Sequence, residues 1–169
     1  VTGLRHIKDI IVNETLDRID KISNPETRGD YIGIPCGISD LDRIITGLNK
    51  SDLIILGARP GMGKTSFALN VARNVAVQQG KSVCFFSLEM TRDQLAQRML
   101  SDEASIKSEK LRSGDIAGPE WTRLIQASDI LSKAPIYFDE SSGITVPEIK
   151  AKVRRMKKAD LVIIDYLQL

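Results

Sequence analysis

A loop with several glycines, placed between an apolar run and an amphipathic segment, constrains this chain more than any other feature. The apolar run Leu53–Leu56 predicts a buried strand, and residues 57–63 follow it directly. Apolar side chains then recur at helical spacing from Thr65 to Gln79, and Gly80 ends the segment. A strand, a loop of small residues and a helix together surround a polyphosphate with backbone N–H groups.

Two residues give this loop its chemistry. Lys64 supplies a mobile positive charge for the β- and γ-phosphates of a nucleotide, and Thr65 supplies a hydroxyl for Mg²⁺. The loop departs from the pattern G-x-x-x-x-G-K-[ST] at Ala58, which fits there if its φ is negative. We expect ATP to be bound by the following residues: Ala58, Arg59, Pro60, Gly61, Met62, Gly63, Lys64, Thr65 and Ser66.

Composition narrows the class of protein. The 169 residues suit one α/β domain, and a net charge of +2 is too small to indicate nucleic-acid binding by itself. Cys36 and Cys84 lie far apart, without metal-ligand spacing or a secretory segment, which indicates a reducing cytoplasm. No apolar run is long enough to span a bilayer, so we expect no membrane partner.

Strand and helix patterns alternate along the rest of the chain. Strands are predicted at Ser82–Leu88, Pro135–Asp139 and Leu161–Ile164, in addition to the one before the loop. Helices are predicted over residues 92–101, 108–111, 120–132 and 147–158. This alternation predicts an α/β fold with a mainly parallel sheet flanked by helices.

The amino-terminal part has a different pattern. Residues 4–22 predict an amphipathic helix, residues 23–30 a polar linker, and residues 31–169 the α/β domain. The apolar stripe of the helix can pack on its own domain or on another subunit. The residues alone favour the first, because most amphipathic helices cover their own core.

Polar residues at the carboxyl ends of the strands are the candidate catalytic groups, because ligands of parallel sheets bind there. Asp165 has the position from which phosphate-loop enzymes hold Mg²⁺. Glu89 can activate a water molecule or can simply be an acid at a helix start, and the residues leave both open. Gln168 can reach a γ-phosphate or be an ordinary loop residue. Asp139 and Glu140 are interpreted as solvated or capping groups.

Six basic residues lie between positions 150 and 158. A solvated helix face is the ordinary interpretation of such a run. Contact with DNA or another partner is the alternative, although no aromatic side chains interleave the charges.

Four motifs follow one another in an order that is typical of one protein family. They are Ile34–Gly37 with Leu41-Asp42, Ala58–Thr65, Phe86–Met90 and Asp165–Leu169. Together they resemble the replicative DNA helicases of the DnaB family over nearly the whole chain. Cys36 departs from the threonine that is usual in that family.

This resemblance implies a RecA-like P-loop ATPase domain in a homo-hexameric ring around single-stranded DNA. It implies that Lys64 and Thr65 contact phosphate and Mg²⁺, and that Asp165 is the Walker B acid. It further implies that Glu89 is the general base and that Lys64 is the second catalytic residue. Gln168 is implied to sense the γ-phosphate. In that family the helix at residues 1–22 is a linker that docks on a neighbouring subunit, so the resemblance reverses the preference for self-packing.

The implied function is ATP-driven 5′→3′ translocation on single-stranded DNA and unwinding at the replication fork. ATP and Mg²⁺ are the implied cofactors, and primase and a helicase loader are implied partners of the full-length protein. The implied location is cytoplasmic, at the nucleoid, or in a phage-infected cell. The sequence holds neither the family's amino-terminal helical domain nor its DNA loops and arginine finger. We therefore expect this fragment to bind ATP but to hydrolyse it weakly or not at all.

Two alternatives compete with this function. One is a ring ATPase similar to RecA or KaiC that unwinds no fork, against which the motifs at residues 88–90 and 165–168 argue. The other is a non-catalytic nucleotide-binding or docking module for a helicase loader.

Overall fold

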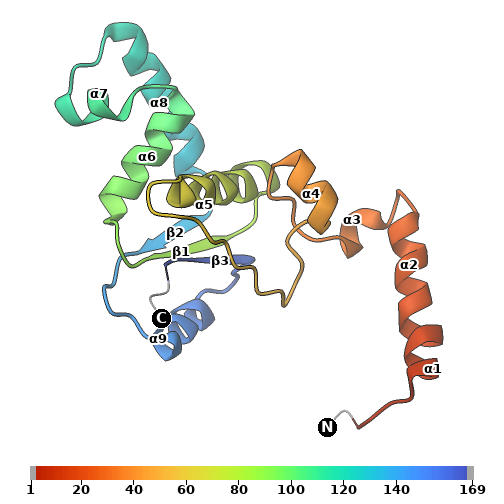
Figure 1. Cartoon of the computed structure of the whole chain (residues 1–169). Helices are drawn as coiled ribbons and strands as arrows, with labels where there is room; N and C mark the ends of the chain where they lie inside the picture. The colour runs from red at the N-terminus through yellow and green to blue at the C-terminus, as the bar shows by residue number, and fades with distance from the viewer. Residues whose placement is uncertain (1–2, 167–169) are drawn as a thin grey trace.

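A parallel sheet of three strands lies at the centre of the structure, a computed structural model that describes residues 3–166 (Figure 1). The strands are β1 (Val83–Ser87), β2 (Ile136–Asp139) and β3 (Leu161–Asp165), and their order is β2-β1-β3. Strand β1 pairs on both sides, and all five of its residues are buried. The predicted α/β fold with a parallel sheet is confirmed.

Helices alternate with these strands as the sequence predicts. They are α5 (Lys64–Arg73) with its π-helical extension η2 (Asn74–Gln78), α6 (Arg92–Ala104), α7 (Ser108–Ser113), α8 (Gly118–Ser132) and α9 (Val146–Arg155). Among residues 3–166, no helix is both long and apolar enough to cross a membrane.

The alternation of side chains along β1 builds a core on each face of the sheet. Val83 and Phe85 lie in the larger core, which α5, η2 and α6 cover, and the Phe85 ring centroid is 5.4 Å from that of Phe138. Cys84 and Phe86 face the other way and pack with Ile149 of α9. Figure 1 shows α5 and α9 on opposite sides of the sheet. The sheet edge is therefore positioned by packing on both faces.

The predicted strand before the phosphate loop is wrong. Residues 53–57 form no strand, and the side chains of Leu53 and Ile55 are 87% and 84% exposed. An apolar run indicates that its side chains favour burial, but a strand also needs a neighbouring strand that pairs with its backbone. Neither β2 nor β3 pairs with this segment, and all four apolar side chains of the run are exposed.

The amino-terminal helix is confirmed from Ile7 onward. It consists of α1 (Ile7–Ile10), the π-helical η1 (Ile11–Thr15) and α2 (Leu16–Ser23), and none of its residues is buried. Figure 1 shows this segment extending away from the sheet. The end of the predicted polar linker forms a short helix, α3 (Arg28–Tyr31), and α4 (Ser39–Ile45) follows.

Candidate nucleotide-binding site

The phosphate loop enters α5 through glycines in the left-handed region. Gly61 has a φ of +77° and Gly63 a φ of +84°, which side chains with a Cβ rarely adopt. The Phe67 N–H donates to the Gly63 carbonyl at 2.9 Å and starts the helix. The φ of Ala58 is not positive, so alanine fits at the position where the pattern has glycine.

Most backbone N–H groups of this loop are uncommitted. Among residues 57–63, the structure gives a backbone acceptor only to the Met62 N–H, which donates to the Arg59 carbonyl at 3.2 Å. All residues of the loop are exposed, and partial burial begins at Lys64 and Thr65. These N–H groups and the positive end of the α5 dipole can therefore face an anion.

A buried carboxylate joins the end of the loop to the end of β3. The side chain of Asp165 is 5% exposed and accepts a hydrogen bond of 2.7 Å from the Thr65 hydroxyl. Its other oxygen lies 3.2 Å from Lys64 Nζ. The same ammonium lies 3.9 Å from the centroid of the Tyr166 ring, within the range of a cation–π contact. The structure thus brings three predicted site residues together: Lys64, Thr65 and Asp165.

Glu89 lies at the same edge of the sheet. Ser87, at the end of β1, pairs in register with Asp165, and the Leu88 N–H donates to the Asp165 carbonyl at 2.8 Å. The Glu89 side chain is exposed, and within residues 3–166 its carboxylate has no hydrogen bond or ion pair. A carboxylate without a competing partner can accept a proton from water.

Thr65 and Asp165 suit Mg²⁺. Residues 3–166 hold no group of three or more His, Cys, Asp or Glu that could bind a metal by itself. Mg²⁺ at a nucleotide needs no such group, because waters and phosphate oxygens fill most of its six positions. One hydroxyl beside one buried carboxylate is the donor set that this chemistry requires.

Asp139 and Glu140 make hydrogen bonds and ion pairs outside the phosphate site, in agreement with their interpretation as capping groups. Asp139 accepts from the Ser141 N–H at 2.9 Å and pairs with Lys152. Glu140 accepts from the Arg92 N–H at the start of α6, and this bond lowers the pKa of its carboxyl. Gln168 lies outside the described residues.

Two neighbours of the site are not predictable from the residue pattern. One is Tyr166, whose ring faces Lys64, and the other is Ser87, whose buried hydroxyl bonds to Met90. The only sequence signal for Ser87 is a polar residue at the end of an apolar strand run.

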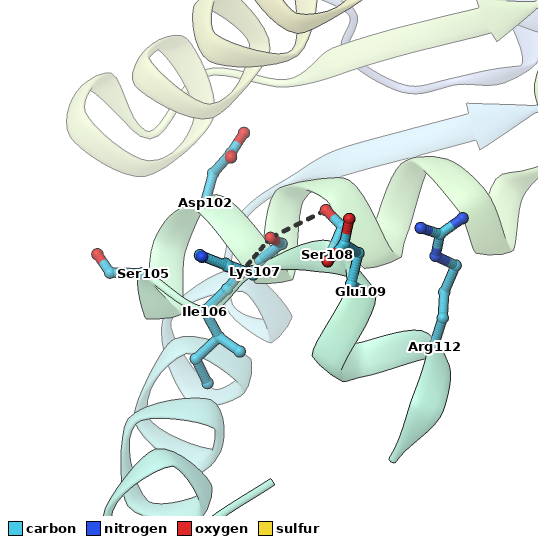
Figure 2. A pocket seen from close by; sticks show the side chains of 8 residues that line it. Asp102, Ser105, Ile106, Lys107, Ser108, Glu109 and Arg112 are labelled. Atoms are coloured by element: carbon cyan, nitrogen blue, oxygen red, sulfur yellow. Dashed lines mark hydrogen bonds between the residues drawn. The ribbon is translucent and has the colours of Figure 1, made fainter. Parts of the chain in front are cut away.

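A separate hollow lies between α6 and α7 (Figure 2). Its charged side chains include two acids, Asp102 and Glu109, and two bases, Lys107 and Arg112. The Ser108 hydroxyl donates to Ser101 at 3.1 Å. This hollow begins at the end of α6 opposite to Glu89, so it is not part of the phosphate site.

The geometry agrees with comparisons to known proteins. The model of the "DnaB-like helicase C terminal domain" family matches residues 33–169. The chain belongs to this family. It is 45% identical over 171 residues to the replicative DNA helicase DnaC of Bacillus subtilis, and 45% identical over 170 residues to DnaB of Geobacillus stearothermophilus. Each match covers 99% of this chain and 37% of the relative, so the DnaB-like chain spans little more than a third of these relatives.

Solved structures of DnaB-like proteins have the same fold. A solved ATPase domain matches with a TM-score of 0.84 and 30% identity, over 98% of this chain and 58% of that one. A DnaB-like replicative helicase, studied with its interactions with primase, matches with a TM-score of 0.82 and 28% identity. That match covers 98% of this chain and 39% of the solved chain. The RecA-like fold class expected from the resemblance is confirmed.

Proposed function

We propose that this chain is the nucleotide-binding part of the motor of a replicative DNA helicase. The observation that carries the proposal is the contact of Lys64 and Thr65 with one buried carboxylate, Asp165, beside the turn that holds Glu89. This is the arrangement that phosphoryl transfer to water requires: a loop for phosphates, a metal-binding pair and a base.

ATP binds with its phosphates against the loop at residues 57–63. The uncommitted N–H groups of the loop donate to phosphate oxygens, and the Lys64 ammonium neutralises the β- and γ-phosphates. Lys64 must leave Asp165 to do so, because its ammonium is paired with that carboxylate in the structure. The centroid of the Tyr166 ring lies 3.9 Å from the Lys64 ammonium, next to the loop.

Thr65 and Asp165 are the residues that would hold Mg²⁺ in this proposal. When bound, Mg²⁺ neutralises charge on the β- and γ-phosphates during transfer. Asp165 is well placed for this role because its burial leaves the charge little screened by solvent.

Glu89 accepts the proton of the attacking water. The water oxygen forms a bond to the γ-phosphorus, the bond to the oxygen bridging the β- and γ-phosphates breaks, and the electron pair leaves with ADP. The proton passes to the Glu89 carboxylate. Gln168 senses the γ-phosphate, and an arginine from a neighbouring subunit completes the site.

The partners follow from the same proposal. The chain works in a homo-hexamer around single-stranded DNA, with the exposed apolar residues of α1, η1 and α2 docked on a neighbouring subunit. Primase and a helicase loader are partners of the full-length protein, which acts at the bacterial or phage replication fork in the cytoplasm. The exposure of Leu16 and Ile19, 55% and 57%, supports the docking role.

The test is ATP hydrolysis by the full-length protein with and without single-stranded DNA. We expect DNA to stimulate hydrolysis and Glu89→Gln to abolish it while leaving ATP binding intact. Hydrolysis by Glu89→Gln at the parent rate would exclude Glu89 as the base. A parent rate that DNA does not change would favour a ring ATPase that unwinds no fork.

A further inference from the structure

The buried hydroxyl of Ser87 closes the turn that carries Glu89. Ser87 is 3% exposed at the end of β1. Its Oγ accepts a hydrogen bond of 3.0 Å from the Met90 N–H and donates one of 2.8 Å to the Met90 carbonyl. One side chain thus satisfies both polar groups of the same residue, and Leu88 and Glu89 form the span between the two ends.

The segments on either side of this turn are fixed independently. On the β1 side, the Leu88 N–H donates to the Asp165 carbonyl at 2.8 Å. On the α6 side, Thr91 and Gln94 form a capping box, and the Arg92 N–H donates to Glu140 at 2.6 Å. The Ser87 hydroxyl is therefore the group that holds the interior of the turn against two fixed ends.

The Glu89 side chain depends on this backbone for its direction. Within residues 3–166, no hydrogen bond or ion pair holds its exposed carboxylate in place. A general base works only when its oxygen lies within hydrogen-bond reach of the water it activates. Without such a bond, the direction of the carboxylate depends on the conformation of residues 88–90.

We propose that Ser87 is a positioning residue for ATP hydrolysis, whose hydroxyl fixes the turn at residues 88–90 so that Glu89 faces the attacking water. The inference rests on the proposed role of Glu89 as the base. The chemistry of the hydroxyl favours this role over simple packing. A serine at the end of an apolar strand is costly to bury unless it both donates and accepts, and here both bonds go to the residue next to Glu89.

The first experiment compares Ser87→Ala with Ser101→Ala in the full-length protein. Ser101 is a matched control because it is also a buried serine, 7% exposed, with its hydroxyl bonded to a backbone carbonyl, that of Ile106. We expect Ser87→Ala to lower kcat roughly 10- to 100-fold, with the KM for ATP and the affinity for a non-hydrolysable ATP analogue unchanged. Ser101→Ala should leave kcat at the parent value. Equal kcat values for the two variants would overturn the proposal.

A second measurement separates positioning from general damage. Amide hydrogen exchange should become faster at Met90 in Ser87→Ala, while Phe85 and Leu95 in the core keep their protection. Unchanged exchange at Met90 would contradict the proposed clamp. If the alanine variant melts at a lower temperature, Ser87→Cys takes its place, because the thiol has similar volume but hydrogen-bonds weakly.

A double-mutant cycle distinguishes failure of this inference from failure of the proposed base. If Ser87 acts through Glu89, Glu89→Gln should cost far less in kcat in the Ser87→Ala background than in the parent. If the fold-loss in kcat of the double variant equals the product of the two single fold-losses, the two residues act independently. That result would overturn the positioning role. A parent-like kcat for Glu89→Gln alone would instead refute the base assignment.

Discussion

The Thr65 hydroxyl donates a hydrogen bond of 2.7 Å to the Asp165 carboxylate, 100 residues further along the chain. Thr65 lies in the first turn of α5, and Asp165 is the last residue of β3. The bond therefore fixes the end of the phosphate loop against the carboxyl edge of the sheet. Because Lys64 pairs with the same carboxylate at 3.2 Å, the proposed binding of nucleotide phosphates by Lys64 requires this lysine to leave the ion pair.

Lys64→Ala tests the contribution of that lysine to nucleotide binding. A charge-assisted hydrogen bond contributes about 1.5–3 kcal/mol, so we expect the affinity for Mg-ATP to fall roughly 10- to 100-fold. Titration with a fluorescent ATP analogue measures this change. The control is Lys150→Ala, which removes an exposed lysine of α9 that has no ion pair among the described residues. Equal affinities for the two variants would contradict the assignment.

The strand ends explain why much of this site is predictable from sequence. Asp165 follows an apolar run and Lys64 precedes an amphipathic one, and parallel strands bring such ends to one edge. The three paired strands and the helices that alternate with them follow from the same periodicity. The glycines before Lys64 are likewise predictable, because few other residues adopt their positive φ.

Other features depend on geometry that composition does not encode. The run at residues 53–56 is as apolar as a core strand, yet pairing requires a neighbour that the periodicity of one segment cannot identify. Glu140 caps a helix 48 residues before it in the chain, which no local pattern indicates. The Ser87 bonds to Met90 and the Tyr166 ring over Lys64 likewise arise from turns whose conformation only the structure supplies.

Arg73→Lys tests the ion pair that joins α5 to α6. Arg73 donates to both oxygens of Glu103, from Nε at 2.8 Å and from Nη2 at 3.0 Å, and the Glu103 side chain is only 12% exposed. Lysine keeps the charge but cannot present this planar pair of donors. We expect the free energy of unfolding to fall by about 1 kcal/mol in urea titrations.

Lys133→Gln is the control for this ion pair. It breaks the Lys133–Asp129 pair on α8, in which both side chains are mostly exposed. Such pairs contribute less than about 0.5 kcal/mol. Equal losses for Arg73→Lys and Lys133→Gln would show that the bidentate geometry between the helices contributes nothing beyond ordinary surface charge pairing.

The pair of Asp139 and Lys152 should make stability depend on pH. Partial burial raises the pKa of the Asp139 carboxyl, but hydrogen bonds from Lys152 and Ser141 lower it by more. The net effect is a pKa of about 2 in place of the ordinary 3.8. A carboxyl whose pKa is lower in the folded state than in the unfolded state stabilises the protein fully at a pH above its unfolded-state pKa. This stabilisation is lost as the pH falls through its folded-state pKa. The contribution is therefore present above about pH 4 and lost by about pH 2.

Lys152→Gln tests this dependence. The Lys152 side chain is 40% exposed, so solvent screens the ion pair. We therefore expect the free energy of unfolding to fall by only about 1 kcal/mol at neutral pH. The difference from the parent should shrink between about pH 4 and pH 2. Urea titrations at several pH values measure it, with Lys150→Gln on the same helix as the unpaired control. A difference that stays constant with pH would exclude the Asp139 titration as its cause.

Leu16→Ser with Ile19→Ser tests docking of the amino-terminal helix on a neighbouring subunit. Both side chains are more than half exposed, so the free energy of unfolding of the monomer should change by less than about 0.5 kcal/mol. If the two side chains are buried at a subunit interface, each contributes about 1.5–3 kcal/mol, and ring assembly should weaken by at least about 100-fold. Sedimentation of the full-length protein measures assembly, and Arg18→Ser, at an exposed charged position of the same helix, is the control. Unchanged sedimentation of the double variant would show that this apolar stripe does not hold the ring together.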